Sequence, residues 1–121
     1  MVNTNVLSFE QLRVANIERS YQFKNSKGEL VHPDGFKSGT WTIGDWMNAV
    51  TGELGEACNF IKKVRRGDMT MDEARSSIQK EFADVITYLD IAAYICDIDL
   101  GEAVRSKFNE ISDRVGATVK L

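Results

Sequence analysis

The chain has 121 residues, 43% of them hydrophobic and 27% charged, and its net charge is −3. This length predicts one domain, residues 1–121, with a single core, and the negative charge disfavours binding to a nucleic-acid polymer. Because the sequence has neither an apolar run of about 18 residues nor a basic, apolar start, we expect no membrane span, no signal peptide and a cytoplasmic protein.

Start and stop signals predict four helices and no sheet. The expected helices cover about residues 9–23, 43–66, 71–96 and 100–115. Each follows a residue that typically caps a helix N-terminus: Ser8, Thr42, Thr70 and Asp99. Gly67 and Gly116 end the second and the fourth helix. The sequence therefore predicts an all-α four-helix bundle.

The connection between the first and second helices is unusually long. Residues 24–41 are rich in Gly, Lys and Ser and contain the only proline, with a short extended piece near Leu30. Loops of this length in compact domains are usually functional or disordered. If this connection closes over a bound base, it is the candidate for the element that selects the nucleotide.

A period of about 100° per residue places the apolar residues of the two central helices on one stripe each. The expected stripe of the helix over 43–66 is Ile43, Met47, Val50, Leu54, Ala57 and Ile61. That of the helix over 71–96 is Ile78, Phe82, Val85, Leu89, Ala92 and Cys96. We expect both stripes to be buried, and we expect Cys58 and Cys96 to be buried free thiols.

Two pairs of acidic residues lie on the same side of these stripes. Glu53 and Glu56 flank the first stripe, and Glu81 and Asp84 flank the second. Members of each pair are three residues apart and so are neighbours on the helix surface. The short link after Gly67 makes the two helices antiparallel, which turns the pairs toward each other. We therefore expect four carboxylates to meet at the edge of the core.

Four unpaired carboxylates repel one another, and a hard cation removes this repulsion. Mg²⁺ prefers oxygen ligands together with substrate phosphates. The alternative is that both pairs are ordinary solvated acids on helix surfaces. Gly52 and Gly55 favour the metal site, because residues without side chains let a ligand or a neighbouring helix approach the carboxylates.

The pattern Glu53-Leu-Gly-Glu56 followed by Glu81-Phe-Ala-Asp84 resembles the ExxE…ExxD motif of MazG-like nucleoside triphosphate pyrophosphohydrolases. This all-α superfamily includes dCTP pyrophosphatases and dimeric dUTPases. The stretches "GELGEACNFIKKVRRGD" and "DLGEAVRSKFNEISDRVG" are similar to its small single-domain members. The resemblance covers roughly residues 41–116, whereas residues 24–41 match no pattern.

The resemblance implies a bundle of the all-α NTP pyrophosphatase type. It also implies hydrolysis of a (deoxy)nucleoside triphosphate to the monophosphate and pyrophosphate, for nucleotide-pool control or house-cleaning. Mg²⁺, or Mn²⁺ in its place, would be held by Glu53, Glu56, Glu81 and Asp84. We nominate Glu53 as the base that activates the attacking water. A thin core and the resemblance together imply a homodimer or homotetramer.

Four polar residues are candidates for contacts with the phosphates. Lys107, Asn109 and Arg114 resemble phosphate contacts of the family, and Lys63 lies on the acidic side of its helix. The alternative for each is a solvated side chain on the surface.

Four further residues are candidates for contacts with the base. Tyr88 follows Asp84 by one turn, and an aromatic residue at this step packs on the base in dCTP pyrophosphatase relatives. Trp41 and Trp46 can stack on any base, although Trp46 fits the core equally well. Asn16 occupies an apolar face, where its amide either reads a base edge or is satisfied by the protein.

A non-enzymatic reading stays open. The chain is then a helical bundle that regulates or binds a partner and retains a degenerate metal site. The presence of all four carboxylates argues against such degeneracy.

Overall fold

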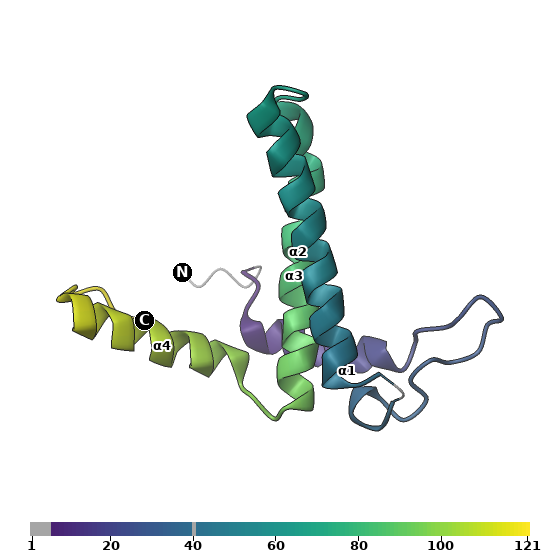
Figure 1. The fold of residues 1–121 in the computed structure, drawn as a ribbon. Coiled ribbons are helices and arrows are strands. Elements are labelled where there is room, and N and C mark those ends of the chain that lie inside the picture. The colour runs from purple at the N-terminus through teal and green to yellow at the C-terminus, as the bar shows by residue number, and fades with distance from the viewer. Residues whose placement is uncertain (1–5, 40) are drawn as a thin grey trace.

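The computed structural model describes residues 6–39 and 41–121, and within these ranges the regular elements are all helices, with no strand (Figure 1). Its elements are α1 (Phe9–Ser20), the single-turn helix η1 (Phe36–Ser38), α2 (Ile43–Arg66), α3 (Met71–Ile95) and α4 (Leu100–Val115). The predicted all-α fold with four α-helices and a long first connection is confirmed. Only an isolated antiparallel bridge between Lys24 and Leu30 marks the expected extended piece.

The helix ends follow from local capping. The side chains of the four predicted caps, Ser8, Thr42, Thr70 and Asp99, each accept a hydrogen bond from the backbone N–H three residues later. α2 and α4 end at Gly67 and Gly116, whose φ angles of +83° and +74° favour glycine. α1 ends three residues earlier than predicted. The chain turns there so that Phe23 can pack against His32 and Phe36.

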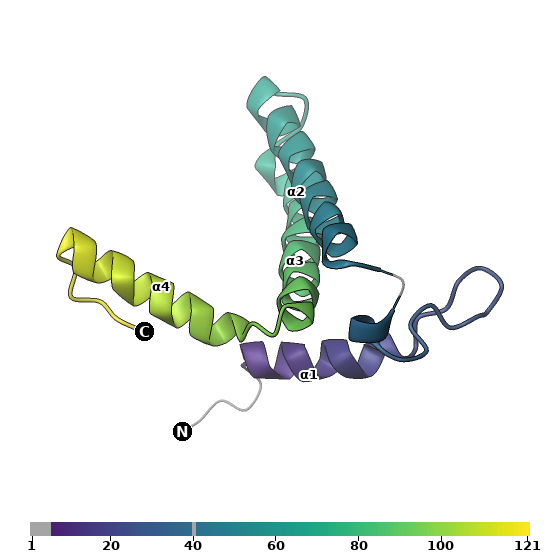
Figure 2. The same cartoon turned by 60° about the horizontal axis from the view of Figure 1, so that its bottom comes forward.

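α2 and α3 form a long antiparallel hairpin, and α1 crosses the end at which α2 begins and α3 finishes (Figures 1 and 2). α4 leaves from this same end and projects away from the hairpin. It meets the rest of the chain mainly at α1, where Gly101 lies close to Phe9; a Cβ at Gly101 would be 3.2 Å from that of Phe9. The four helices therefore do not enclose one core within a single chain.

The core lies where η1, the start of α2 and the end of α3 meet. Its buried residues are Phe36, Trp46, Ile91 and Ala92. The predicted stripes are only partly correct. Val50, Ala57, Ile78 and Ala92 are buried, but Ile43, Met47, Leu54, Ile61 and Phe82 are 41–51% exposed. The contact between α2 and α3 covers one edge of each stripe, and within residues 6–39 and 41–121 no other helix packs over the exposed part.

The two cysteines also differ from the prediction. Cys58 and Cys96 are free thiols, as expected, but both are exposed rather than buried. Cys58 lies on the uncovered side of α2, and Cys96 is the residue after the last turn of α3.

A buried ion pair fastens α1 to α3. Asp90 is 1% exposed, and its Oδ1 lies 3.0 Å from the Arg13 Nη2. The Arg13 Nε donates to both carboxylate oxygens at 3.1 and 3.2 Å, and the Asn16 amide donates to Oδ2 at 3.0 Å. The guanidinium also donates to the Ile98 carbonyl at 2.9 Å. Arg13 therefore ties α1 both to α3 and to the link that precedes α4.

We expect Asp90→Ala to lower the free energy of unfolding by about 3–5 kcal/mol, because Arg13 keeps its charge in a partly buried position without a carboxylate partner. Urea unfolding followed by circular dichroism measures this loss. The matched control is Asp72→Ala, which breaks an exposed pair with Arg75 and should cost less than about 1 kcal/mol. Equal losses in both variants would contradict the role of Asp90.

Candidate functional site

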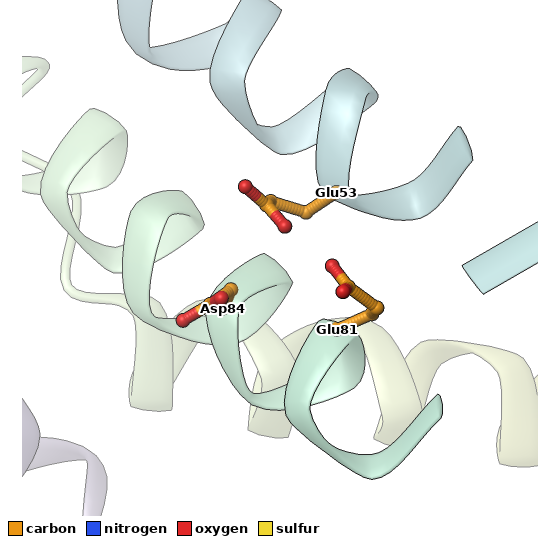
Figure 3. A group of neighbouring side chains, drawn as sticks. All are labelled: Glu53, Glu81 and Asp84. Atoms are coloured by element: carbon orange, nitrogen blue, oxygen red, sulfur yellow. The ribbon is translucent and has the colours of Figure 1, made fainter. Parts of the chain in front are cut away.

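Three carboxylates converge across the α2–α3 hairpin. Glu53 points from α2 toward Glu81 and Asp84 of α3 (Figure 3). One oxygen from each side chain lies within 4.8 Å of the other two, and all three residues are partly buried. Three of the four predicted metal ligands are thus brought together, and the antiparallel hairpin is the reason, because it turns matching helix edges toward each other.

The predicted fourth ligand, Glu56, is exposed and lies outside this close group. Glu56 still affects the protonation of Glu81. The pKa of Glu81 is raised from 4.5 to about 7, first by sharing a proton with Glu53, then by burial, and further by Glu56. One Glu81 oxygen, Oε2, is buried with no hydrogen-bond partner among the described residues.

These three carboxylates fit a divalent cation. Their oxygens are close enough to share one ion, and the unsatisfied Glu81 Oε2 is an acceptor without a donor. Hard cations such as Mg²⁺ prefer such oxygen ligands. Among the described residues, nothing makes the predicted close approach to Gly52 and Gly55, because a Cβ at either position would meet nothing within 4 Å.

An aromatic pocket of about 380 Å³ adjoins the carboxylates. It is lined by Phe23, Lys24, Val31, His32, Trp41, Trp46, Ala49, Glu53 and Tyr88. The ring centroids of Trp41 and Trp46 are 4.8 Å apart, and those of Trp46 and Tyr88 are 5.9 Å apart. The three predicted aromatic residues therefore meet in one pocket. We call Glu53, Glu81 and Asp84 the acidic group, so that Glu53 belongs to both the pocket and the acidic group.

The hydroxyl of Tyr88, in the aromatic pocket, is affected by the charges of the acidic group. Burial raises the pKa of this hydroxyl, and the negative charges of Asp84 and Glu53 raise it further. The hydroxyl is therefore protonated at neutral pH and lies within the field of the carboxylates.

Two nitrogens in the pocket wall lack partners. The Nδ1 of His32 and the Nε1 of Trp46 are buried without a hydrogen-bond partner among the described residues. Burial lowers the pKa of His32, so the ring is neutral at neutral pH. Gly39 leaves room for the His32 ring, because a Cβ at position 39 would lie 2.8 Å from the His32 Nδ1.

The predicted phosphate-binding residues of α4 lie away from the acids. α4 projects from the hairpin (Figures 1 and 2). Two of these residues already have partners. Lys107 pairs with Glu110 at 3.1 Å, and the Asn109 amide bonds to the backbone of Leu121 in both directions. Arg114 lies on the same projecting helix. Within one chain, none of the three joins the acidic group.

The remaining two predicted residues also lie outside the pocket. The ammonium of Lys63 lies 5.5 Å from the centre of the Phe60 ring on α2. The Asn16 amide donates to the Asp90 carboxylate and to the Thr87 carbonyl. Asn16 is therefore a structural amide, which is the second of its two readings, and the prediction that it reads a base is not supported.

Sequence reasoning missed five of the pocket residues. One of them, Ala49, lies in α2, and the others lie in the connection that follows α1: Phe23, Lys24, Val31 and His32. The unusual length of this connection was the available signal, but it could not indicate which side chains turn inward. Lys24 is the only cationic residue that lines this pocket in the part of the chain that the structure describes.

Comparisons with known proteins add no assignment. No protein-family model matches the chain, and no curated protein matches it. Among the described residues, no helix is both long and apolar enough to cross a lipid bilayer.

The crowded carboxylates predict a specific pH dependence. The folded state binds the Glu81 proton more tightly than the unfolded state, with a pKa of about 7 against 4.5. The resulting stability is full below pH 4.5 and is lost as the pH rises through 7. We therefore expect the Tm of metal-free protein to fall over this range, and Glu81→Gln to weaken the fall.

Glu102→Gln is the matched control, because this residue lies in an exposed pair with Arg105. Its Tm should follow the wild-type profile. Mg²⁺ should raise the wild-type Tm more above pH 7 than below pH 5, since protonated carboxyl groups bind metal weakly. A Tm profile of Glu81→Gln that matches wild type would contradict the prediction.

Proposed function

We propose that the protein is a Mg²⁺-dependent pyrophosphohydrolase that converts a nucleoside triphosphate to the monophosphate and pyrophosphate. The observation that carries this proposal is that the acidic group and the aromatic pocket share Glu53. Such a site accepts a ligand with a flat ring at one end and metal-binding phosphates at the other. The ExxE…ExxD resemblance supports the same chemistry.

In this function Glu53, Glu81 and Asp84 hold the cation, and Glu56 lies near enough to assist. When bound, Mg²⁺ supplies positive charge that neutralises the phosphate oxygens and the carboxylates. The raised pKa of Glu81 is consistent with this role, because it reflects first a hydrogen bond to Glu53 and then burial, so a bound cation would take the place of the proton that the two carboxyl groups share.

Glu53 is the proposed general base. A water molecule gives a proton to its carboxylate while the water oxygen bonds to the α-phosphorus. The bond from this phosphorus to the bridging oxygen breaks, and pyrophosphate leaves with the electron pair. Glu53 suits this step because it lies at the boundary between the pocket and the acidic group.

The aromatic pocket is the proposed site for the base. Trp41, Trp46 and Tyr88 offer ring faces for stacking, which is worth about 1–3 kcal/mol per base and depends little on its identity. The unpartnered nitrogens of His32 and Trp46 are candidates for hydrogen bonds to the base. Lys24 adds a positive charge beside the rings.

The alternative is a helical module that binds a partner without catalysis. The large exposed apolar residues of the hairpin and of α4 favour some form of association. Pyrophosphate release from a panel of ribo- and deoxyribonucleoside triphosphates with Mg²⁺ separates the two. No turnover with any member would reject the enzymatic function.

We expect Asp84→Asn to reduce turnover by about 100-fold or more, since losing even an indirect support of a metal site typically costs 10–100-fold. Helicity should be retained, because the substitution removes one of several repelling charges. Asp72→Asn, at an exposed position on the same helix, is the control and should keep its activity. Loss of circular-dichroism signal in Asp84→Asn would instead mark the acid as structural.

We expect Tyr88→Ala to raise KM for every nucleotide in the panel by about 5- to 150-fold, the equivalent of 1–3 kcal/mol of stacking. Steady-state kinetics at saturating Mg²⁺ measures this change, and the metal concentration for half-maximal activity should not move. Tyr21→Ala, at an exposed aromatic residue that does not line the pocket, is the control. An effect confined to kcat would contradict a stacking role.

A further inference from the structure

A triphosphate at the acidic group needs positive charge that α4 does not supply within one chain. α4 and the connection after α1 extend to opposite sides of the hairpin (Figures 1 and 2). A nucleoside triphosphate is strongly negative, and the acidic group that it would approach is negative as well. Because Mg²⁺ offsets only part of this charge, cationic side chains close to the site have to offset more. Those beside the aromatic pocket are the candidates.

Lys24 lies in the wall of this pocket. It lines the pocket together with Glu53, and it forms no ion pair with a carboxylate of the described residues. Its backbone is held in place by an antiparallel bridge to Leu30, next to a 2.9 Å hydrogen bond from the Val31 N–H to the Phe23 carbonyl. The position of Lys24 is therefore fixed, while its ammonium group is available to an anion.

Arg19, in the last turn of α1, lies beside the same wall. Its guanidinium carbon is 5.6 Å from the centre of the Phe23 ring, and Phe23 lines the pocket. Arg19 also forms no ion pair with a carboxylate of the described residues. A guanidinium that contacts a ring keeps N–H donors at its edges, and their planar arrangement matches two oxygens of a phosphate.

The charge of Arg19 also acts on Tyr88, a residue of the pocket. Burial is the main cause that raises the pKa of the Tyr88 hydroxyl, and the charges of the acidic group raise it further, whereas the charge of Arg19 lowers it. Arg19 therefore adds positive charge at a pocket residue that lies within the field of the acidic group.

The pocket sets the direction in which a nucleotide lies. Trp46, Ala49 and Glu53 line it from one face of α2, and the seven residues from Trp46 to Glu53 span about 10 Å at 1.5 Å per residue. A base stacked on Trp46 leaves its sugar beside the small Ala49 side chain and its α-phosphate at Glu53, where the water attacks. The β- and γ-phosphates then need partners of their own.

We propose that Arg19 and Lys24 bind the β- and γ-phosphates, which become the pyrophosphate product, while the acidic group holds the metal ion. This inference rests on the proposed function, because that function places the base in the aromatic pocket. Arg19 can donate two parallel hydrogen bonds to one phosphate, and Lys24 adds a single compact charge. The end of α1 and the connection after it thus supply both a wall for the base and charge for the phosphates.

The first test is calorimetric titration with inorganic pyrophosphate in the presence of Mg²⁺. Arg19→Gln and Lys24→Gln should each raise the Kd for pyrophosphate by about 10-fold, near the lower end for hydrogen bonds to a charged group. The Kd values for the common deoxynucleoside monophosphates should stay within about 2-fold, because these lack the β- and γ-phosphates.

Lys27→Gln and Arg65→Gln are the matched controls. Each removes the same charge at an exposed position outside the pocket, so each should bind pyrophosphate as wild type does. A wild type that does not bind pyrophosphate, or an unchanged pyrophosphate Kd in either pocket variant, would overturn the proposal. So would an equal loss for the monophosphates, which would place the two cations at the α-phosphate or the base.

A second variant of Arg19 separates charge from packing. Arg19→Lys keeps the charge but loses the planar donors, so its pyrophosphate Kd should lie between those of wild type and Arg19→Gln. Equal losses in Arg19→Lys and Arg19→Gln would mean that Arg19 acts by packing on Phe23, and the proposal would fail. Circular dichroism should show wild-type helicity in each variant.

Turnover of the nucleotide panel distinguishes this proposal from the proposed function. If wild type hydrolyses a nucleotide while Arg19→Gln and Lys24→Gln keep its KM and its pyrophosphate affinity, only the phosphate assignment fails. If wild type hydrolyses no nucleotide but binds pyrophosphate through Arg19 and Lys24, the hydrolase function fails and the phosphate site stands.

Discussion

The carboxylate of Asp90 is the charge on which the arrangement of the helices depends. It is buried in the last third of α3, and burial of an unpaired carboxylate is strongly unfavourable. α1 has to bring Arg13 and Asn16 to it, which fixes where α1 crosses the hairpin. Since Arg13 also bonds to the Ile98 carbonyl, the same ion pair sets the direction in which α4 departs.

The aromatic pocket follows from this anchoring. Phe23 lies just beyond the end of α1, so the position of α1 decides where the long connection begins. The connection then returns through His32 and Phe36, whose rings pack against Trp46 at 6.0 and 5.1 Å. Asn16 therefore serves the pocket through the placement of α1 and not through contact with a ligand.

The carboxylates of the acidic group differ from that of Asp90 in their countercharge. Asp90 has its countercharge, whereas Glu53, Glu81 and Asp84 approach one another without a cation from the described residues. Small residues in the hairpin contact, Ala57 and Ala74, are almost fully buried and let the two helices approach closely. Packing thus holds the carboxyl groups so close that Glu81 hydrogen-bonds to Glu53 and is partly buried, and both effects raise the pKa of Glu81. Carboxylates held in this way are characteristic of functional sites.

The sequence by itself determined where the four helices begin, where α2 and α4 end, and that Glu53 faces Glu81 and Asp84, because caps, glycine ends and three-residue spacing act within a few residues of the chain. It did not determine which flank of each amphipathic helix is covered, so the exposure of Leu54 and Phe82 was not foreseen. Nor did it reveal the role of Asn16, the inward turn of His32 or the direction of α4. Tertiary structure decided these, because they depend on contacts between distant residues, such as Arg13 with Asp90, 77 positions apart.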